Sequence, residues 1–256
     1  MKCKQAILAG LLAIFTGNAL QAQESARPTT LNLMSYNVHN CIGMDNVRDY
    51  DRIARIILQA SPDVVALQEL DSATQRNNGI YALGELEQRT GMHGIFSAAI
   101  PFQGGSYGIG ILSKEKPLSY KTVPMPGREE ARSMIVAEFS EYIFCATHQS
   151  LTPEDQQASI HLILNAIKGS KKPVFLAGDM NSLPSDLPQQ MLRKHFITLN
   201  DTASYTFPAN VPDRCIDYLY AYTGNGFRYQ VQQTSVWPED TASDHRPVVV
   251  RIGIVK

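Results

Sequence analysis

The sequence predicts one α/β domain of the α+β type, in which mixed and mostly antiparallel β-sheets pack as a sandwich. Short apolar, β-branched runs are numerous and few helical segments separate them, and neither an internal repeat nor a linker follows Thr30. Strands without a helix between them pair antiparallel, which favours a sandwich over a doubly wound parallel sheet. The 256 residues, 44% hydrophobic and 18% charged, suit one domain of ordinary globular composition.

The N-terminus has the layout of a secretory signal peptide. Lys2 and Lys4 precede an apolar run over 6–15, too short to span a membrane, and a polar region ends at Ala22. We therefore expect an exported protein, periplasmic or secreted, with no stable membrane insertion and no obligate protein partner. The expected organisation is a signal peptide (1–22), a short linker (23–30) and a single domain (31–256).

Charge and cysteine usage argue against two classes of protein. Without Lys2 and Lys4, 21 basic residues stand against 24 acidic ones, a net charge of −3. Proteins that bind nucleic acid non-specifically usually carry a basic surface. Cys41, Cys145 and Cys215 lack C-x-x-C spacing, so they indicate neither a zinc motif nor a dense disulfide framework. One disulfide among these three stays open in an oxidising compartment.

In the first half of the chain, a strand is predicted over 31–36 and a helix over 50–60, where three isoleucines recur at helical spacing. A β-branched run over 64–67 predicts the next strand, and 80–90 a second helix that Gly91 ends. Further strands are expected at 95–100, 108–112, 118–123, 134–139 and 142–147.

In the second half, Thr152 and Pro153 predict a helix start, because a capping hydroxyl precedes proline at the first helical position. Acidic residues follow in the first turn, and the helix should run to about Lys168. The remaining predicted strands are 173–177, 216–220, 227–232 and 247–254.

Polar residues stand at the ends of six of these strands. Strands that run antiparallel to their neighbours bring their starts to the edge where those neighbours end. If the last two of the six run antiparallel to the other four, all the polar groups meet at one rim. Four strands lead into Asn37, Glu69, His148 and Asp179 with Asn181, and two begin at Asp217 and at Asp244–His245.

The chemistry of this set is that of a phosphoester site. Carboxylates and amides offer oxygen ligands, which suit Mg²⁺ or Mn²⁺ rather than zinc. His148 and His245 can hydrogen-bond or protonate phosphate oxygens, and Asp217 is the candidate carboxylate to orient His245 and raise its pKa. A Lewis acid, an oriented water and stabilised phosphate charge are what phosphoester hydrolysis requires.

Six short motifs carry these residues in order along the chain. They are Ser35–Val38 (S-Y-N-V), Leu67–Leu70 (L-Q-E-L), Ala146–His148 (A-T-H), Gly178–Ser182 (G-D-M-N-S), Ile216–Leu219 (I-D-Y-L) and Ser243–Val248 (S-D-H-R-P-V). Together they resemble the motifs of the endonuclease/exonuclease/phosphatase superfamily, or deoxyribonuclease I-like proteins. The likeness covers nearly the whole chain after residue 30. It implies a four-layer fold, with two mostly antiparallel sheets between outer helices.

The resemblance also implies metal and phosphate ligands. Glu69 corresponds to the principal metal ligand, Asn37 lies beside it and touches metal or phosphate, and Asp244 is a second carboxylate near the metal. Arg132 matches a strand arginine that often helps to bind the substrate phosphate.

The remaining motif residues correspond to catalytic groups. Asp179 is expected to position or deprotonate the attacking water, and Asn181 to hold a phosphate oxygen. His148 contacts the phosphate. Asp217 orients His245, which stabilises the phosphate in the transition state.

One segment indicates which branch of the superfamily the chain resembles, and it overlaps a competing motif. Tyr107–Ser113 (Y-G-I-G-I-L-S) is similar to exported phosphodiesterases and phosphatases rather than to apurinic endonucleases. Gly104–Gly108 fits G-x-S-x-G, the serine-hydrolase pattern, which requires a strand before it and a helix after it. A strand-like run follows instead, so we interpret these glycines as a loop beside the site.

The sequence thus predicts an exported, divalent-metal-dependent hydrolase that cleaves a phosphodiester or phosphomonoester by attack of water. Its substrate stays open among a phospholipid head group, an inositol or sugar phosphate and nucleic acid. The alternatives are an exported nuclease of the same fold and a catalytically idle binding protein.

Overall fold

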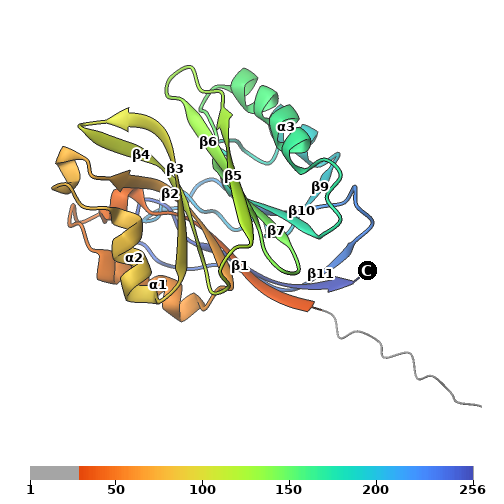
Figure 1. Cartoon of the computed structure of the whole chain (residues 1–256), viewed down its shortest axis with the longest axis horizontal. Coiled ribbons are helices and arrows are strands. Elements are labelled where there is room, and N and C mark those ends of the chain that lie inside the picture. Colours follow the sequence, from red (N-terminus) through yellow and green to blue (C-terminus); the bar gives the residue numbers. More distant parts are fainter. Residues whose placement is uncertain (1–28, 256) are drawn as a thin grey trace, which may run out of the picture.

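Two six-stranded β-sheets pack face to face in the computed structural model, which describes residues 29–255 (Figure 1). The predicted signal peptide and most of the predicted linker lie outside the described residues. The first sheet has the order β11-β12-β1-β2-β4-β3 and the second β5-β6-β7-β8-β10-β9. The first contains β1 (Thr29–Asn37), β2 (Val64–Ser72), β3 (His93–Phe102), β4 (Gly105–Ser113), β11 (Arg228–Val236) and β12 (Val248–Val255). The second contains β5 (Ser119–Met125), β6 (Arg132–Glu138), β7 (Ile143–His148), β8 (Val174–Asp179), β9 (Phe196–Thr198) and β10 (Asp217–Tyr222).

Helices cover the outer face of each sheet. α1 (Tyr50–Ala60) and α2 (Ala82–Thr90) pack on the first sheet, and α3 (Pro153–Ile167) and α4 (Leu187–Leu192) on the second. In Figure 1, α1 and α2 lie on one side of the strands and α3 on the other. One buried core fills the space between the sheets, and another lies under each helical layer. These four layers confirm the fold implied by the motifs.

Side-chain alternation within the strands links the core to the strand ends. Phe144 and Ala146 of β7 face the core between the sheets, while Cys145 faces the helical layer. The next inward position after Ala146 is His148. The same period of two leads to polar residues at the same edge in three other strands: from Leu33 to Asn37, from Ala177 to Asp179 and from Leu219 to Asp217.

Strand directions bring these ends together. β1 runs parallel to β2, and β7 runs parallel to β8. β12 is antiparallel to β1, and β10 is antiparallel to β8. The exits of β1, β7 and β8 and the starts of β10 and β12 therefore share one rim of the sandwich, as the sequence predicted, whereas Glu69 lies within β2, three residues before its end.

Several local predictions need correction. Thr29 and Thr30 belong to β1 rather than to a linker, and β2 continues to Ser72 beyond its predicted end. Neither α4 nor β9 was predicted; α4 has six residues and β9 three, too few to show a periodic pattern.

The serine-hydrolase alternative loses its structural basis. The predicted glycine loop is mostly strand, because β4 begins at Gly105 directly after a turn at Gly104. Ser106 lies inside β4 and pairs with Ser72 of β2 and Pro101 of β3. No helix follows it, so Ser106 does not occupy the sharp strand-to-helix turn of a nucleophilic serine.

Two further points bear on the expected environment. Within residues 29–255, Cys41, Cys145 and Cys215 are all free and buried, so none of them forms a disulfide. None of the helices in that range is long and apolar enough to cross a membrane.

Candidate active site

Glu69 reaches the rim through an irregularity in β2. The pairing of β2 with β4 shifts between Leu67 and Leu70, and Glu69 adopts a φ of 62°. A non-glycine residue in this left-handed region is strained and needs support from its surroundings. Support comes from Asn37, whose Nδ2 donates to Glu69 Oε1 at 2.9 Å and to Asp179 Oδ2 at 3.2 Å. One amide thus joins carboxylates from the two sheets.

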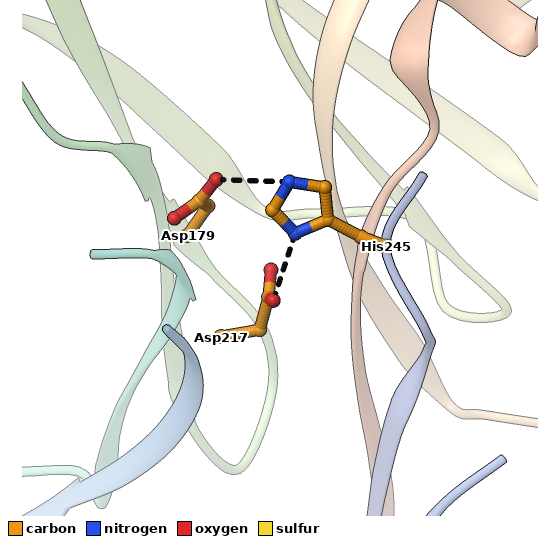
Figure 2. A group of neighbouring side chains, drawn as sticks. All are labelled: Asp179, Asp217 and His245. Atoms are coloured by element: carbon orange, nitrogen blue, oxygen red, sulfur yellow. Dashed lines mark hydrogen bonds and ion pairs between the residues drawn. The ribbon is translucent and has the colours of Figure 1, made fainter. Parts of the chain in front are cut away.

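A buried chain of three side chains lies next to this amide (Figure 2). His245 Nδ1 lies 2.9 Å from Asp217 Oδ2, and His245 Nε2 lies 3.7 Å from Asp179 Oδ2. All three side chains are almost completely buried. His245 lies just before β12 of the first sheet, and both aspartates belong to strands of the second, so this chain spans the interface between the sheets.

His245 is an imidazolium at neutral pH. Burial lowers the pKa of His245, but the carboxylates of Asp217 and then Asp179 raise it more strongly, to about 10. Both ring nitrogens then carry protons, one for each carboxylate. The ring centroid of Phe207 lies 4.7 Å from that of His245 and covers the imidazolium.

Asp179 is poised to exchange a proton near neutral pH. Burial, followed by the charge of Asp217, raises the pKa of Asp179 to about 7. The backbone N–H of Asn181 donates to Asp179 Oδ1 at 2.9 Å and orients the carboxyl group. Asn181 has a φ of 47°, and its Nδ2 donates to Gln149 O at 2.9 Å, which leaves one amide proton for a ligand.

His148 is a neutral imidazole, in contrast to His245. Arg132 Nη1 lies 3.3 Å from His148 Nδ1, and because a guanidinium can only donate, Nδ1 must accept. The ring proton is therefore on Nε2, which lies 3.5 Å from Asp179 Oδ2. Burial and then the charge of Arg132 hold the pKa of His148 well below its usual range.

Gly178 permits the close approach of β7 and β8 at the site. His148 pairs with Asp179 in the parallel register, and Thr147 pairs with Gly178. A Cβ added to Gly178 would lie 2.0 Å from the carbonyl oxygen of Thr147, so any side chain there would push the two strands apart. The glycine of the G-D-M-N-S motif is thus a packing requirement for the His148–Asp179 pair.

Ser243 connects the S-D-H motif to β1. Its Oγ donates to the carbonyl oxygen of Asn37 at 2.7 Å and accepts from the backbone N–H of His245 at 3.3 Å. Asp244 Oδ1 lies 3.9 Å from His39 Nδ1, on the side of the rim that carries Asn37.

An open cleft of about 750 Å³ lies over these groups. Seven of the nine predicted site residues line it: Glu69, Arg132, His148, Asp179, Asn181, Asp244 and His245. Asn37 and Asp217 are completely buried behind them and hydrogen-bond to lining residues. The structure therefore brings the whole predicted set together.

Sequence reasoning missed three neighbours of this set. Glu129 Oε1 lies 3.2 Å from Arg132 Nη2, and Glu130 Oε1 lies 3.1 Å from Arg132 Nη1. They lie three and two residues before Arg132 in the chain, and a pair of acids so close to a proposed phosphate-binding arginine was the available signal. Phe207 had no comparable signal, because its contact with His245 depends on a long loop.

Two groups of side chains could hold a metal ion. Ligand atoms of Asp179, Asp217 and His245 lie within 4.8 Å of one another. These atoms are already paired with each other, and a protonated His245 repels a cation. Glu69, in contrast, makes a single hydrogen bond within residues 29–255, from Asn37, and its other carboxylate oxygen is available beside the cleft. The oxygen-rich surroundings of Glu69 fit a hard divalent cation better.

The profile of the Endonuclease/Exonuclease/phosphatase family matches residues 34–245. The chain therefore belongs to this family, whose members hydrolyse phosphoester bonds. The match includes all six motifs apart from the last residues of the S-D-H-R-P-V segment. No curated protein sequence matches the chain.

Solved structures share the fold. An endonuclease/exonuclease/phosphatase from Beutenbergia cavernae DSM 12333 has 25% identity and a TM-score of 0.74, over 88% of this chain and 72% of that one. D. rerio TDP2 complexed with a single-strand DNA product has 18% identity and a TM-score of 0.68, over 88% and 99%. A mannosyl-6-phosphatase from Bacteroides thetaiotaomicron VPI-5482 has 17% identity and a TM-score of 0.65, over 88% and 100%. The names of these proteins indicate different substrates, so the shared fold does not identify the substrate of this chain.

Proposed function

We propose that this protein is a phosphoesterase that uses Mg²⁺ or Mn²⁺ to hydrolyse a phosphodiester or phosphomonoester by attack of water. The Asp179–His245–Asp217 chain beside Asn37 and Glu69 carries this proposal. It combines a carboxyl group whose pKa is raised to about 7 with an imidazolium, both at the base of one cleft. A base and a cationic hydrogen-bond donor are the two protein groups that attack of water on a phosphate requires.

Glu69 is the proposed principal ligand of the cation, with Asn37 and Asp244 beside it. The free oxygen of Glu69 and the position of Asp244 on the cleft wall support this assignment. When bound, the cation supplies a Lewis acid that offsets charge on the phosphate oxygens.

The other side chains of the cleft have separate roles in positioning water and binding the phosphate. Asp179 orients the water and accepts its proton, while the backbone N–H of Asn181 keeps the carboxyl group in position. His245 donates from Nε2 to a phosphate oxygen, and Asp217 holds the ring from Nδ1. His148 donates from Nε2 as a neutral imidazole, and the free amide proton of Asn181 and the guanidinium of Arg132 bind further phosphate oxygens.

Hydrolysis of model monoesters and diesters, with Mg²⁺, Mn²⁺ or EDTA, tests the proposal. Glu69→Ala, Asp179→Asn and His245→Ala should each lower kcat/KM by roughly a hundredfold or more, the usual effect of losing preorganised charge stabilisation. Glu141→Gln is a matched control on an exposed turn outside the cleft. Full activity in any of the three site variants would contradict the assignment.

Substrate class and location remain proposals. We propose a phospholipid head group or an inositol or sugar phosphate rather than nucleic acid, supported by a net charge that is slightly negative. Steep salt dependence of DNA binding would instead favour the nuclease alternative, and a lack of both turnover and metal binding would favour an idle binding protein. Export to the periplasm or medium is supported by residues 1–22, and N-terminal sequencing of the mature protein tests it.

A further inference from the structure

Arg132 is already paired with acidic side chains of the protein itself. It begins β6, is 8% exposed and lines the cleft. Its Nη1 contacts His148 Nδ1 at 3.3 Å and Glu130 Oε1 at 3.1 Å, and its Nη2 contacts Glu129 Oε1 at 3.2 Å. Two carboxylates for one guanidinium leave this group with an excess negative charge, on the wall where an anionic substrate must bind.

The two glutamates are held in different ways. Glu129 accepts hydrogen bonds from the backbone N–H of Leu151 at 2.8 Å and from the Ser150 hydroxyl at 2.8 Å. It therefore ties Arg132 to the loop that follows β7. The side chain of Glu130 makes no hydrogen bond or ion pair within residues 29–255 other than its ion pair with Arg132, and it lines the cleft.

The backbone at Glu130 is part of a tight turn, whereas its side chain is partly exposed. A Cβ added to Gly127 would lie 1.9 Å from the carbonyl oxygen of Glu130, so the turn that leads into β6 is tightly closed. The Glu130 side chain is 28% exposed, and its only ion pair within residues 29–255 is the one with Arg132, so a turn toward solvent breaks that single polar contact. Release of Glu130 therefore frees one N–H of Arg132 Nη1, while the other N–H keeps its contact with His148 and Nη2 keeps its contact with Glu129.

Glu130 also faces a second carboxylate. Burial raises the pKa of Glu130, the charge of Arg132 lowers it, and the carboxylate of Glu69 raises it again, with a net upward shift. The ion pair with Arg132 thus holds Glu130 against repulsion from Glu69. A ligand that competes for Arg132 needs to break only this one exchangeable contact.

We propose that Glu130 is an internal anion gate. Its carboxylate occupies the phosphate position on Arg132 in the resting enzyme, and the substrate phosphate displaces it. The proposal rests on the function proposed above, because it assumes that the cleft binds a phosphoester. A phosphate with several charged oxygens displaces the single carboxylate, whereas weak anions do not. The returning carboxylate also expels the phosphate product.

Glu130→Gln removes the charge and keeps the size of the side chain. We expect this variant to bind inorganic phosphate about tenfold more tightly in the presence of Mg²⁺, as removing about 1.4 kcal/mol of competition would do. The KM for p-nitrophenyl phosphate should fall by a similar factor without a loss of kcat from the chemical step. Glu130→Ala should behave in the same way, and Glu141→Gln should match the wild type.

Calorimetric titration with inorganic phosphate separates this proposal from the proposed function, because it needs no turnover. Tighter phosphate binding by both Glu130 variants supports the gate even if the wild type cleaves no tested ester. Unchanged or weaker phosphate binding in folded Glu130→Gln and Glu130→Ala would overturn the gate even if the wild type is an active phosphoesterase. A fall in kcat with unchanged KM would also overturn it, because Glu130 would then be positioning Arg132.

Discussion

At the scale of single residues, the surroundings that raise the pKa of Asp179 also lower the stability of the folded protein at neutral pH. A carboxyl group buried next to the charge of Asp217 is disfavoured in its ionised form, and this raises the pKa of Asp179 to about 7. The folded state therefore binds a proton between about pH 4 and pH 7 that the unfolded state has released. The stability of the metal-free protein consequently falls as the pH rises through this window.

Asp179→Asn should remove this cost. In EDTA at pH 8 we expect the variant to be more stable than the wild type by on the order of 2 kcal/mol, within the limit of about 4 kcal/mol set by three pKa units. At pH 4, where the carboxyl group is protonated in the folded protein, the difference should disappear. Urea unfolding at the two pH values measures it. Equal stability of the two proteins at pH 8 would show that Asp179 is not strained by its surroundings.

At the scale of secondary-structure elements, α1 and α2 end at residues that differ in how easily they adopt a left-handed backbone conformation. Ser61 ends α1 in the left-handed region with a φ of 47°, whereas Gly91 ends α2 with a φ of 69°. Glycine adopts this conformation without steric cost, and serine does not. Ser61→Gly should therefore stabilise the protein by about 0.5 kcal/mol, and Gly91→Ala should destabilise it by about 1 kcal/mol. Thermal unfolding tests the pair, and shifts of the same sign would contradict it.

The two longest helices begin with different caps. Asp49 accepts a hydrogen bond from the backbone N–H of Arg52 at 2.8 Å. Thr152, predicted to cap α3, makes no capping bond, and its hydroxyl donates to Glu129 Oε2 at 3.3 Å instead. Asp49→Ala should cost about 1 kcal/mol of unfolding free energy, the usual value of a lost cap. Thr152→Ala should cost less than about 0.5 kcal/mol, and an equal loss in denaturant unfolding would contradict this ranking.

At the scale of the whole molecule, the site is also a junction between the two sheets. His245 precedes β12 of the first sheet, and Asp217 begins β10 of the second. Their 2.9 Å contact is buried, so it joins the sheets where the apolar core gives way to the rim. Function and sheet packing therefore depend on the same ion pair.

The contribution of this pair should depend on pH. The pKa of His245 is raised from its ordinary value of 6.5 to about 10, so the stabilisation is fully present below pH 6.5 and is lost as the pH rises through 10. In EDTA, the stability difference between the wild type and His245→Gln should therefore shrink between pH 6 and pH 10.5. Subtracting the variant removes the effect of titrating groups that do not interact with His245. A constant difference would show that His245 is not charged in the folded protein.

Local pattern in the sequence was sufficient for much of the fold. The helical spacing of Ile53, Ile56 and Ile57 predicted α1 with its observed bounds, and β-branched runs located ten of the strands within a few residues. Motif order indicated the family and the site residues, because chemistry that needs these groups keeps them at strand ends. These are properties of neighbouring residues, and the sequence by itself determined them.

Tertiary structure alone decided how those residues act on one another. The contact between Asn37 and Asp179 joins positions 142 residues apart, and no local pattern encodes it. The left-handed conformation of Glu69 lies where the pairing of β2 with β4 shifts register, and the proton position on His148 depends on the buried guanidinium of Arg132. Burial and charge in three dimensions set these states, since the electrostatic surroundings of a side chain form only when distant strands pack together.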